Sequence, residues 1–300
     1  MILIMNDRKN KNAVSADTLH THTHGTSFNE FLNKITLGNS YELIKQIPDS
    51  SIDLIVIDPP YEYTTGGGAG CFGTKQRSYH EEYYKVATNT NSLQKTKEYK
   101  NEGQKRVWED KKKSREEIKH ISSGFDLELL DELDRTMKRI NIYIWCSKHQ
   151  VEPLLKHYLD KKCNIEILTW HKTNPLPTMN NTYANDTEYC IFARESGVAL
   201  NGDYETKRKY YVTNINKKDK DKFKHPTIKP LQIIKNLIIN SSNEGEIVLD
   251  CFSGSGTTCV AAKELNRQFI GMEIDPEYYK ISIDRLNGIL ANGQTSMFIN

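Results

Sequence analysis

After about residue 28, segments with the apolar pattern of strands alternate with segments that have the apolar pattern of helices. Residues 51–58 show the largely apolar pattern of a strand that is buried on both faces of a parallel sheet. This run ends at Asp58 because Pro59 and Pro60 have no backbone N–H to donate to a ladder. Similar runs predict strands at residues 34–37, 140–146, 165–170, 188–193, 246–250 and 268–273.

Helical periodicity separates these apolar runs. Helices are predicted at residues 28–33, 40–47, 126–139, 150–159, 231–240, 257–266 and 276–290. Strands that alternate with helices predict an α/β fold with a doubly wound, mostly parallel sheet. Residues 188–193 follow the preceding strand closely enough to be its antiparallel hairpin partner.

The same patterns suggest how the chain is organised into domains. Residues 1–28 are polar and aperiodic, which predicts a loosely attached arm, and residues 29–295 form one predicted catalytic domain. Residues 62–124, first glycine-rich and then charged, predict a mobile insertion with possible DNA contacts. Residues 195–224 are basic and predict a second insertion. Alternating histidines at 20, 22 and 24 lack carboxylate or cysteine companions, so no metal site is predicted.

Composition narrows the class of protein. The 300 residues are 37% hydrophobic and 27% charged, and no apolar run approaches the roughly 18 residues that a membrane helix needs. The first residues lack the order of features found in a signal peptide, so a cytoplasmic location is expected. The six cysteines include no CxxC pair, which argues against a zinc ribbon or a dithiol redox site.

Charge is informative through its distribution. A net charge of +2 does not by itself indicate nucleic acid, but Lys207, Arg208 and Lys209 precede a second basic run at residues 217–224. Such runs can neutralise phosphates. A solvated loop explains each single run equally well.

The first candidate for chemistry is the glycine loop after the predicted strand at 246–250. Glycines there let the backbone approach a ligand, and Glu273, at the end of the next strand, is placed to accept hydrogen bonds from ribose hydroxyls. A GxGxxG dinucleotide fingerprint would need glycine where Cys259 stands. The loop therefore suits a nucleoside without phosphates better, for which S-adenosylmethionine is the common case.

The second candidate is Asp58-Pro59-Pro60-Tyr61, at the carboxyl end of a buried strand, where ligands gather in open α/β sheets. A simple strand stop is the plain alternative, but the second proline and the aromatic residue favour function. The Asp58 carboxylate and the Pro59 carbonyl can accept both hydrogens of an exocyclic amine and stabilise the charge that develops on it. Tyr61 offers a ring on which an extruded base can stack.

Together these motifs resemble those of amino-methylating DNA methyltransferases, and their order resembles the permuted β class of that family. The catalytic motif comes first, the element 225–230 (HPTIKP) follows a variable region, and the glycine loop comes near the end. The resemblance covers residues 34–62 and 126–290. It implies a Rossmann-like fold of the class I S-adenosylmethionine-dependent type and site-specific methylation of N6 on a flipped-out adenine in double-stranded DNA.

The resemblance also implies roles for individual residues. Asp58, Pro59, Pro60 and Tyr61 would bind and activate the base. The family often carries Gly-Asp where this chain has Gly38-Asn39, so the contact of Asn39 with the cofactor adenine would be altered. The residues implied to surround the cofactor are Asn39, His225, Thr227, Lys229, Asp250, Phe252, Ser253, Gly254, Ser255, Gly256, Thr257 and Glu273.

Alternatives remain open at this point. Cytosine C5 methylation is opposed because none of the six cysteines follows a proline. Cytosine N4 methylation uses the same amine chemistry, but the family usually places serine where Asp58 stands. Methylation of adenine in RNA and an inactive DNA-binding module are further alternatives, although the second conflicts with an intact catalytic motif.

DNA contacts are expected at Lys172, Asn174, Lys207, Arg208 and Lys209. The DNA base sequence that would be recognised cannot be predicted from either insertion. A cognate restriction endonuclease is a possible partner, and both a monomer and a homodimer are compatible with the sequence.

Overall fold

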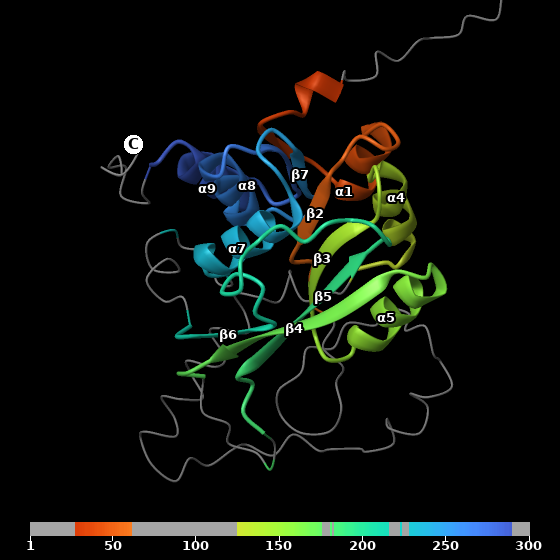
Figure 1. Ribbon diagram of the computed structural model, residues 1–300. Helices are drawn as coiled ribbons and strands as arrows, with labels where there is room; N and C mark the ends of the chain where they lie inside the picture. Colours follow the sequence, from red (N-terminus) through yellow and green to blue (C-terminus); the bar gives the residue numbers. More distant parts are fainter. Residues whose placement is uncertain are drawn as a thin grey trace, which may run out of the picture.

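The fold is seen in a computed structural model, in which residues 28–61, 125–175, 181, 183–215, 223 and 228–289 are described. The described strands form one sheet in the order β1-β8-β7-β2-β3-β5-β4-β6 (Figure 1). Strand β5 runs antiparallel to β3 and β4, and the other neighbouring pairs are parallel. The predicted mostly parallel sheet with an antiparallel hairpin strand is therefore confirmed. The strands are β1 (Lys34–Leu37), β2 (Leu54–Ile57), β3 (Asn141–Cys146), β4 (Asn164–Lys172), β5 (Thr187–Arg194), β6 (Tyr210–Thr213), β7 (Ile247–Asp250) and β8 (Gln268–Glu273).

Two layers of helices cover this sheet, which makes the architecture doubly wound (Figure 1). Every residue of the central strands β2 and β3 is buried, as parallel strands covered on both faces require. The helical elements are η1 (Phe28–Glu30), α1 (Ser40–Leu43), η2 (Ile44–Gln46), α4 (Glu128–Thr136), α5 (Val151–Asp160), α7 (Leu231–Ser241), α8 (Thr257–Glu264) and α9 (Pro276–Leu286). Among the described residues, no helix combines the length and the apolar character needed to cross a bilayer.

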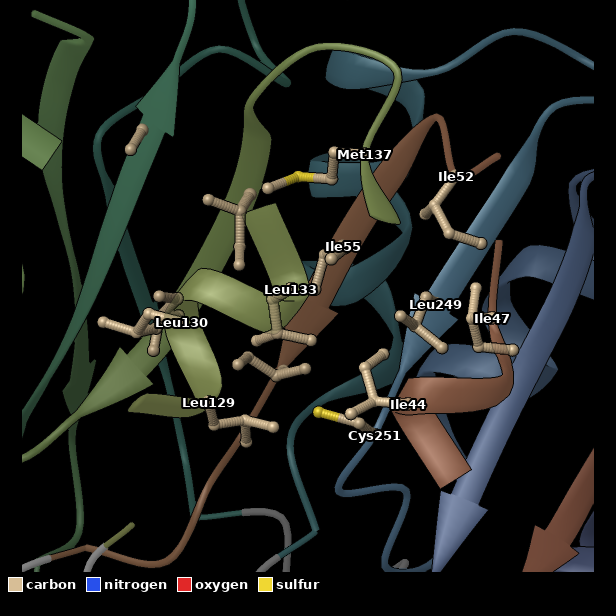
Figure 2. Packing of buried hydrophobic residues seen from close by; sticks show 14 of the residues in the cluster. Ile44, Ile47, Ile52, Ile55, Leu129, Leu130, Leu133, Met137, Leu249 and Cys251 are labelled. Atoms are coloured by element: carbon tan, nitrogen blue, oxygen red, sulfur yellow. The ribbon is translucent and has the colours of Figure 1, made fainter. Parts of the chain in front are cut away.

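Successive residues of β2 point into two separate hydrophobic cores. Ile55 packs with Ile44 and with Leu133 of α4 on one face, as Figure 2 shows. Val56 belongs to the core on the opposite face, together with Ile234 of α7. Alternation along the strand thus fixes its register, because a slip of one residue would exchange the two cores.

Several predicted helices are shorter in the structure, for identifiable reasons. The expected helix at 40–47 is α1 followed by the 3-10 turn η2, because Pro48 disfavours helical geometry at the residue before it. The expected helix at 28–33 is the short turn η1, and Asn33 has a positive φ of 57°. Helix α4 ends at Thr136 because Met137 is extended and forms a parallel bridge with Ile52.

The C-terminal helices also stop earlier than predicted. Helix α8 ends at Glu264, shortly before Asn266 adopts a left-handed φ of 58°. Helix α9 ends at Leu286, two residues before Gly288, whose φ is 71°. Residues with positive φ commonly end helices, which accounts for the shortening.

Strand β6 lies within the basic segment 195–224, where no strand was predicted. It pairs in parallel with the last residues of β4 and forms an edge of the sheet. Its four residues, Tyr-Tyr-Val-Thr, are exposed or only half-buried, and this short run follows directly after the basic residues that dominate the segment. The predicted insertion at 62–124 and the arm at 1–28 lie almost entirely outside the described residues.

Candidate functional site

The two predicted motifs meet at the centre of the sheet. Strands β2 and β7 are parallel neighbours, with Leu54 opposite Val248 and Ile55 opposite Leu249. Strands β2 and β7 end at the same edge of the sheet (Figure 1). Asp58, which follows β2, therefore lies near Asp250, the residue of β7 that leads into the glycine loop 252–256. This is the edge at which ligands bind in open α/β sheets.

The glycine loop is a tight turn that joins β7 to α8. Gly254 and Gly256 have φ values of 50° and 75°, which favour glycine. A Cβ on Gly256 would also lie 3.0 Å from the Cβ of Ser282. The backbone N–H of Gly256 donates to the carbonyl of Ser253 at 2.7 Å, which closes the turn.

Glu273 lies beside this loop at the end of β8 and is 7% exposed. Its Oε2 accepts a hydrogen bond from the backbone N–H of Gly254 at 2.6 Å, and its Oε1 accepts from that of Asp275 at 2.8 Å. Burial raises the pKa of Glu273, although these amides act in the opposite direction. The carboxylate is therefore held in a fixed orientation next to the loop.

Asn39 lies near Glu273, because Leu37 at the end of β1 pairs with Glu273. Its Oδ1 accepts a hydrogen bond from the backbone N–H of Tyr41 at 3.0 Å, which caps α1. Asn39 thus has a structural role in the protein alone, at the position where the sequence predicts a cofactor contact.

Asp250, the last residue of β7, is 3% exposed. Its Oδ1 accepts a hydrogen bond from the backbone N–H of Phe252 at 3.0 Å. Burial raises the pKa of Asp250 to about 7, and repulsion from Asp58 and Glu273 contributes. The group therefore changes charge close to neutral pH.

Arg285 braces the glycine loop from α9 and was not identified from the sequence. Its Nη1 donates to Ser255 Oγ at 3.0 Å, to the Ser255 carbonyl at 3.2 Å and to Thr257 Oγ1 at 2.7 Å. The guanidinium also lies 4.7 Å from the ring of Phe223. A buried arginine on an amphipathic helix gives no sequence signal that separates this role from an ordinary surface charge.

Lys229 contacts the catalytic candidate Asp58. Its Nζ lies 2.5 Å from Asp58 Oδ2 and 3.1 Å from the hydroxyl of Tyr61. The Nζ is also 5.2 Å from the ring centroids of both Tyr61 and Trp145. The sequence grouped Lys229 with the cofactor residues, whereas the structure brings it together with the Asp58 motif.

Burial controls the ionisation of this pair. It raises the pKa of Asp58, an effect that Lys229 opposes and Glu188 reinforces. Burial acts to lower the pKa of Lys229, but the attraction of Asp58 and Glu188 outweighs it and the pKa is raised. The ammonium thus stays charged and favours the ionised form of Asp58.

Glu188 is a third charged member of this cluster and was not predicted. Its Oε2 accepts a hydrogen bond from the Tyr61 hydroxyl at 2.9 Å and lies 3.0 Å from Lys229 Nζ. Its Oε1 forms an ion pair with Lys172. Although burial works in the opposite direction, the two lysines lower the pKa of Glu188 to about 2.

Gln150 fixes the backbone of the Asp58 motif from the other side. Its Nε2 donates to the carbonyl of Pro60 at 3.2 Å, and its Oε1 accepts from the backbone N–H of Ser147 at 2.9 Å. Pro59 is buried and Pro60 is half-buried. The motif is thereby held by a side chain that the sequence showed only as the start of a helix.

The candidate DNA contacts are dispersed. Lys172 lies in the cluster with Glu188, and Asn174 Oδ1 accepts a hydrogen bond from the backbone N–H of Ile215 at 2.6 Å. Arg208 pairs with Glu205 at 2.9 Å and Lys209 pairs with Glu166, both near the start of β6. Lys207 lies in the same segment. His225 and Thr227, predicted near the cofactor, lie outside the described residues.

Comparison with known proteins was made on sequence and on structure. The sequence model of a family described as DNA methylase, for N6 and N4 methyltransferases, matches residues 52–284. The Type II methyltransferase M2.LlaDCHI of Lactococcus lactis subsp. cremoris is 31% identical over 267 residues, which cover 83% of this chain and 87% of the relative. M2.MboI of Moraxella bovis is 29% identical over 267 residues, which cover 84% and 86%.

Solved structures share the fold. The M1.HpyAVI-SAM complex is similar with a TM-score of 0.54 and 23% identity, over 84% of this chain and 98% of the other. The PvuII DNA methyltransferase, described as cytosine-N4-specific, has a TM-score of 0.54 and 17% identity, over 84% and 85%. At these identities the likeness concerns the architecture alone.

Proposed function

Because the chain belongs to the N6/N4 family of DNA methylases, we propose that it methylates N6 of adenine in double-stranded DNA, with S-adenosylmethionine as the methyl donor. The observation that carries the proposal is the position of the Asp58 carboxylate. It stands at the end of β2, directly beside the glycine loop that follows the parallel neighbour β7. A base bound at Asp58 and a cofactor bound at the loop would lie next to each other.

The catalytic motif suits an amine. The exocyclic amine of adenine is a poor nucleophile because its lone pair is delocalised into the ring. The Asp58 carboxylate and the Pro59 carbonyl accept its two hydrogens and stabilise the positive charge that develops on the nitrogen. Lys229 is bonded to Oδ2 of Asp58, so in this proposal Oδ1 accepts from the substrate amine.

The aromatic residue of the motif suits a base outside the duplex. A stacked base cannot reach the cofactor, so it has to be extruded. The ring of Tyr61 stacks against the extruded base, while its hydroxyl is held by Glu188. The rigid prolines and the hydrogen bond from Gln150 to Pro60 keep the acceptors in place without reorganisation.

The residues around the loop fit S-adenosylmethionine, which supplies an electrophilic methyl group on a sulfonium when it is bound. Glu273 has a fixed carboxylate for the ribose hydroxyls. Asp250, when ionised, favours a cation nearby. Tight glycine backbone lets the ligand approach closely. We assign cofactor contacts to Asn39, His225, Thr227, Lys229, Asp250, Phe252, Ser253, Gly254, Ser255, Gly256, Thr257 and Glu273. Of these, Lys229 also contacts Asp58.

We propose that DNA contacts the basic residues that lie in or near β4 and β6. The pairs of Arg208 with Glu205 and of Lys209 with Glu166 are exposed, and solvent-exposed ion pairs contribute little to stability. Phosphates can therefore replace the acidic partners. We assign DNA contacts to Asn174, Lys207, Arg208 and Lys209, whereas Lys172 is held by Glu188 in the cluster around Asp58. We also propose a cognate restriction endonuclease as the partner enzyme.

The test is the modified base itself. DNA from a host that expresses the chain is hydrolysed to nucleosides and analysed by mass spectrometry, with N6-methyladenine as the expected product. Asp58→Ala is expected to abolish the product while S-adenosylmethionine binding, measured by calorimetry, is retained. Asp49→Ala is the matched control, because Asp49 is an exposed carboxylate that pairs with Arg135.

Other outcomes would replace the proposal. N4-methylcytosine in place of N6-methyladenine would overturn the assignment to adenine and leave the family intact. Transfer of labelled methyl to hairpin RNA in preference to duplex DNA would overturn the assignment to DNA. Folded wild-type protein that binds the cofactor and methylates neither substrate would favour a binding module.

A further inference from the structure

Glu188 reaches the catalytic edge because β5 is antiparallel. The parallel strands present their carboxyl ends at this edge, whereas β5 presents its first residues. Glu188 is the second residue of β5 and lies opposite Trp170 of β4. Its side chain therefore extends next to the residues that follow β2 and β4.

The contacts of Glu188 link both parts of the base site. One oxygen, Oε2, accepts from the Tyr61 hydroxyl at 2.9 Å and contacts Lys229 Nζ at 3.0 Å. The other oxygen is occupied by Lys172. The side chains of Glu188, Lys172 and Lys229 are 16%, 18% and 7% exposed, so solvent screens these contacts little.

We propose that Glu188 is a positioning residue for the methyl transfer, which holds the Tyr61 ring and the Lys229 ammonium in place against Asp58. This inference rests on the proposed function of the same site. Glu188 itself touches neither base nor cofactor in this arrangement. It acts through Tyr61 on the stacking surface and through Lys229 on the acceptor.

The charges alternate along the cluster in the order Asp58, Lys229, Glu188 and Lys172, so that Lys229 is shared between two carboxylates. With a neutral residue at 188, Lys229 keeps Asp58 but loses the second of these two carboxylates. The Asp58 carboxylate then becomes more acidic and a weaker acceptor for the substrate amine. The titratable and charged groups that face Asp58 are Tyr61 from its own segment, Cys146 from β3, Glu188 and Cys190 from β5, Lys229 before α7 and Asp250 from β7.

The test uses the full chain with Glu188→Gln, which keeps the size of the side chain and removes its charge. We expect kcat to fall about tenfold or more, because misplacement of a substrate-positioning group by about 1 Å costs up to a hundredfold. The KM for S-adenosylmethionine should stay unchanged. The acidic limb of the profile of kcat against pH should move to lower pH, by up to about one unit, because a negative neighbour of Asp58 is lost.

Two further variants separate charge from geometry. Glu188→Asp keeps the charge with a shorter side chain, so the acidic limb should stay near its wild-type position while kcat falls in part. Glu195→Gln is the matched control, because Glu195 follows the opposite end of β5 and its side chain forms an exposed ion pair with Arg139. It should retain wild-type kcat and pH dependence.

The proposal is overturned if Glu188→Gln matches Glu195→Gln, or if it loses activity with no movement of the acidic limb, as a purely structural role predicts. If thermal melting shows that Glu188→Gln is unfolded, Glu188→Asp decides, and a wild-type kcat there also overturns the proposal. Failure of the proposed function is distinct, since wild-type protein would then produce no methylated adenine in DNA.

Discussion

Lys229 Nζ lies 2.5 Å from Asp58 Oδ2, although the two residues are 171 positions apart in the chain. Both side chains come from segments that follow or precede regular elements at the same edge of the sheet. The lysine therefore gives the Asp58 carboxylate a charge partner that does not depend on substrate.

Replacement of Lys229 by methionine should raise the pKa of Asp58, because the attraction that opposes burial is lost. In the proposed mechanism the ionised form of Asp58 accepts the amine hydrogen, so the acidic limb of the kcat profile should move to higher pH. This direction is opposite to that expected for Glu188→Gln.

Loss of Lys229 also leaves Asp58 and Glu188 without their shared partner, so we expect a loss of stability of about 3 kcal/mol. Thermal melting and cofactor binding are measured alongside the pH profile to confirm that the variant is folded. A folded variant with an unmoved acidic limb would contradict the role of Lys229.

Asp250 should make cofactor affinity depend on pH. Burial raises the pKa of Asp250 to about 7, so the carboxylate is ionised above that pH and neutral below it. A negative carboxylate favours a sulfonium nearby, so the affinity for S-adenosylmethionine should rise as pH increases through about 7 and then level off. Calorimetric titrations across this range measure the effect.

Asp250→Asn is the control for this dependence, because it removes the titration and keeps the shape. The affinity of this variant for S-adenosylmethionine should stay constant across the same pH range.

The stability of the wild-type protein should change with pH in the sense opposite to its cofactor affinity. A raised pKa means that the folded state keeps the proton more tightly, so the contribution of Asp250 to stability falls as pH rises from the ordinary range of aspartate to about 7. If cofactor affinity or stability changed with pH equally in the wild-type protein and in Asp250→Asn, the assignment of these changes to Asp250 would be contradicted.

Lys172 has two explanations that salt dependence separates. The sequence assigns it to DNA, and the structure pairs it with Glu188. We expect Lys172→Met to lower kcat about tenfold and to leave unchanged the dependence of DNA affinity on salt. Lys207→Met, in the basic segment near β6, should instead reduce the logarithmic salt slope by about 1. A reduced salt slope of DNA affinity for Lys172→Met would instead indicate that Lys172 contacts a phosphate.

Arg285 should control the cofactor through the loop that it braces. Arg285→Met removes three hydrogen bonds to Ser255 and Thr257, so the loop loses its fixed shape. We expect the KM for S-adenosylmethionine to rise about tenfold, with a smaller effect on the KM for DNA. Lys280→Met, on an exposed position of the same helix α9, is the matched control. Equal effects of the two variants would refute this role.

The sequence predicted the order of strands and helices well because these depend on local periodicity. Strands β2 and β3 are continuous apolar runs, and their burial confirms the pattern. Strand β6 was not predicted because it is only four residues long and follows directly after a basic run, which led the whole segment to be interpreted as an insertion. The ends of helices were less predictable, since Met137 leaves α4 to form a bridge with Ile52.

The candidate site likewise contains residues that the sequence predicted and residues that it did not. Asp58 and Glu273 were recognised because each follows an apolar strand at the end where ligands bind. Glu188 and Gln150 gave no comparable signal, because their importance comes from neighbours that are distant in the chain. Lys229 was recognised as part of a motif, but only three-dimensional contacts could associate it with Asp58.

The central position of β2 has a consequence for synthesis of the chain. The neighbouring strand β7 is synthesised much later than β2, since Asp53 and Ile247, which are hydrogen-bonded, are 194 positions apart. While the ribosome makes the intervening residues, one side of β2 has unpaired backbone groups and an apolar surface. Such nascent chains are prone to aggregate, so chaperones that shield exposed strands should improve the yield of this protein.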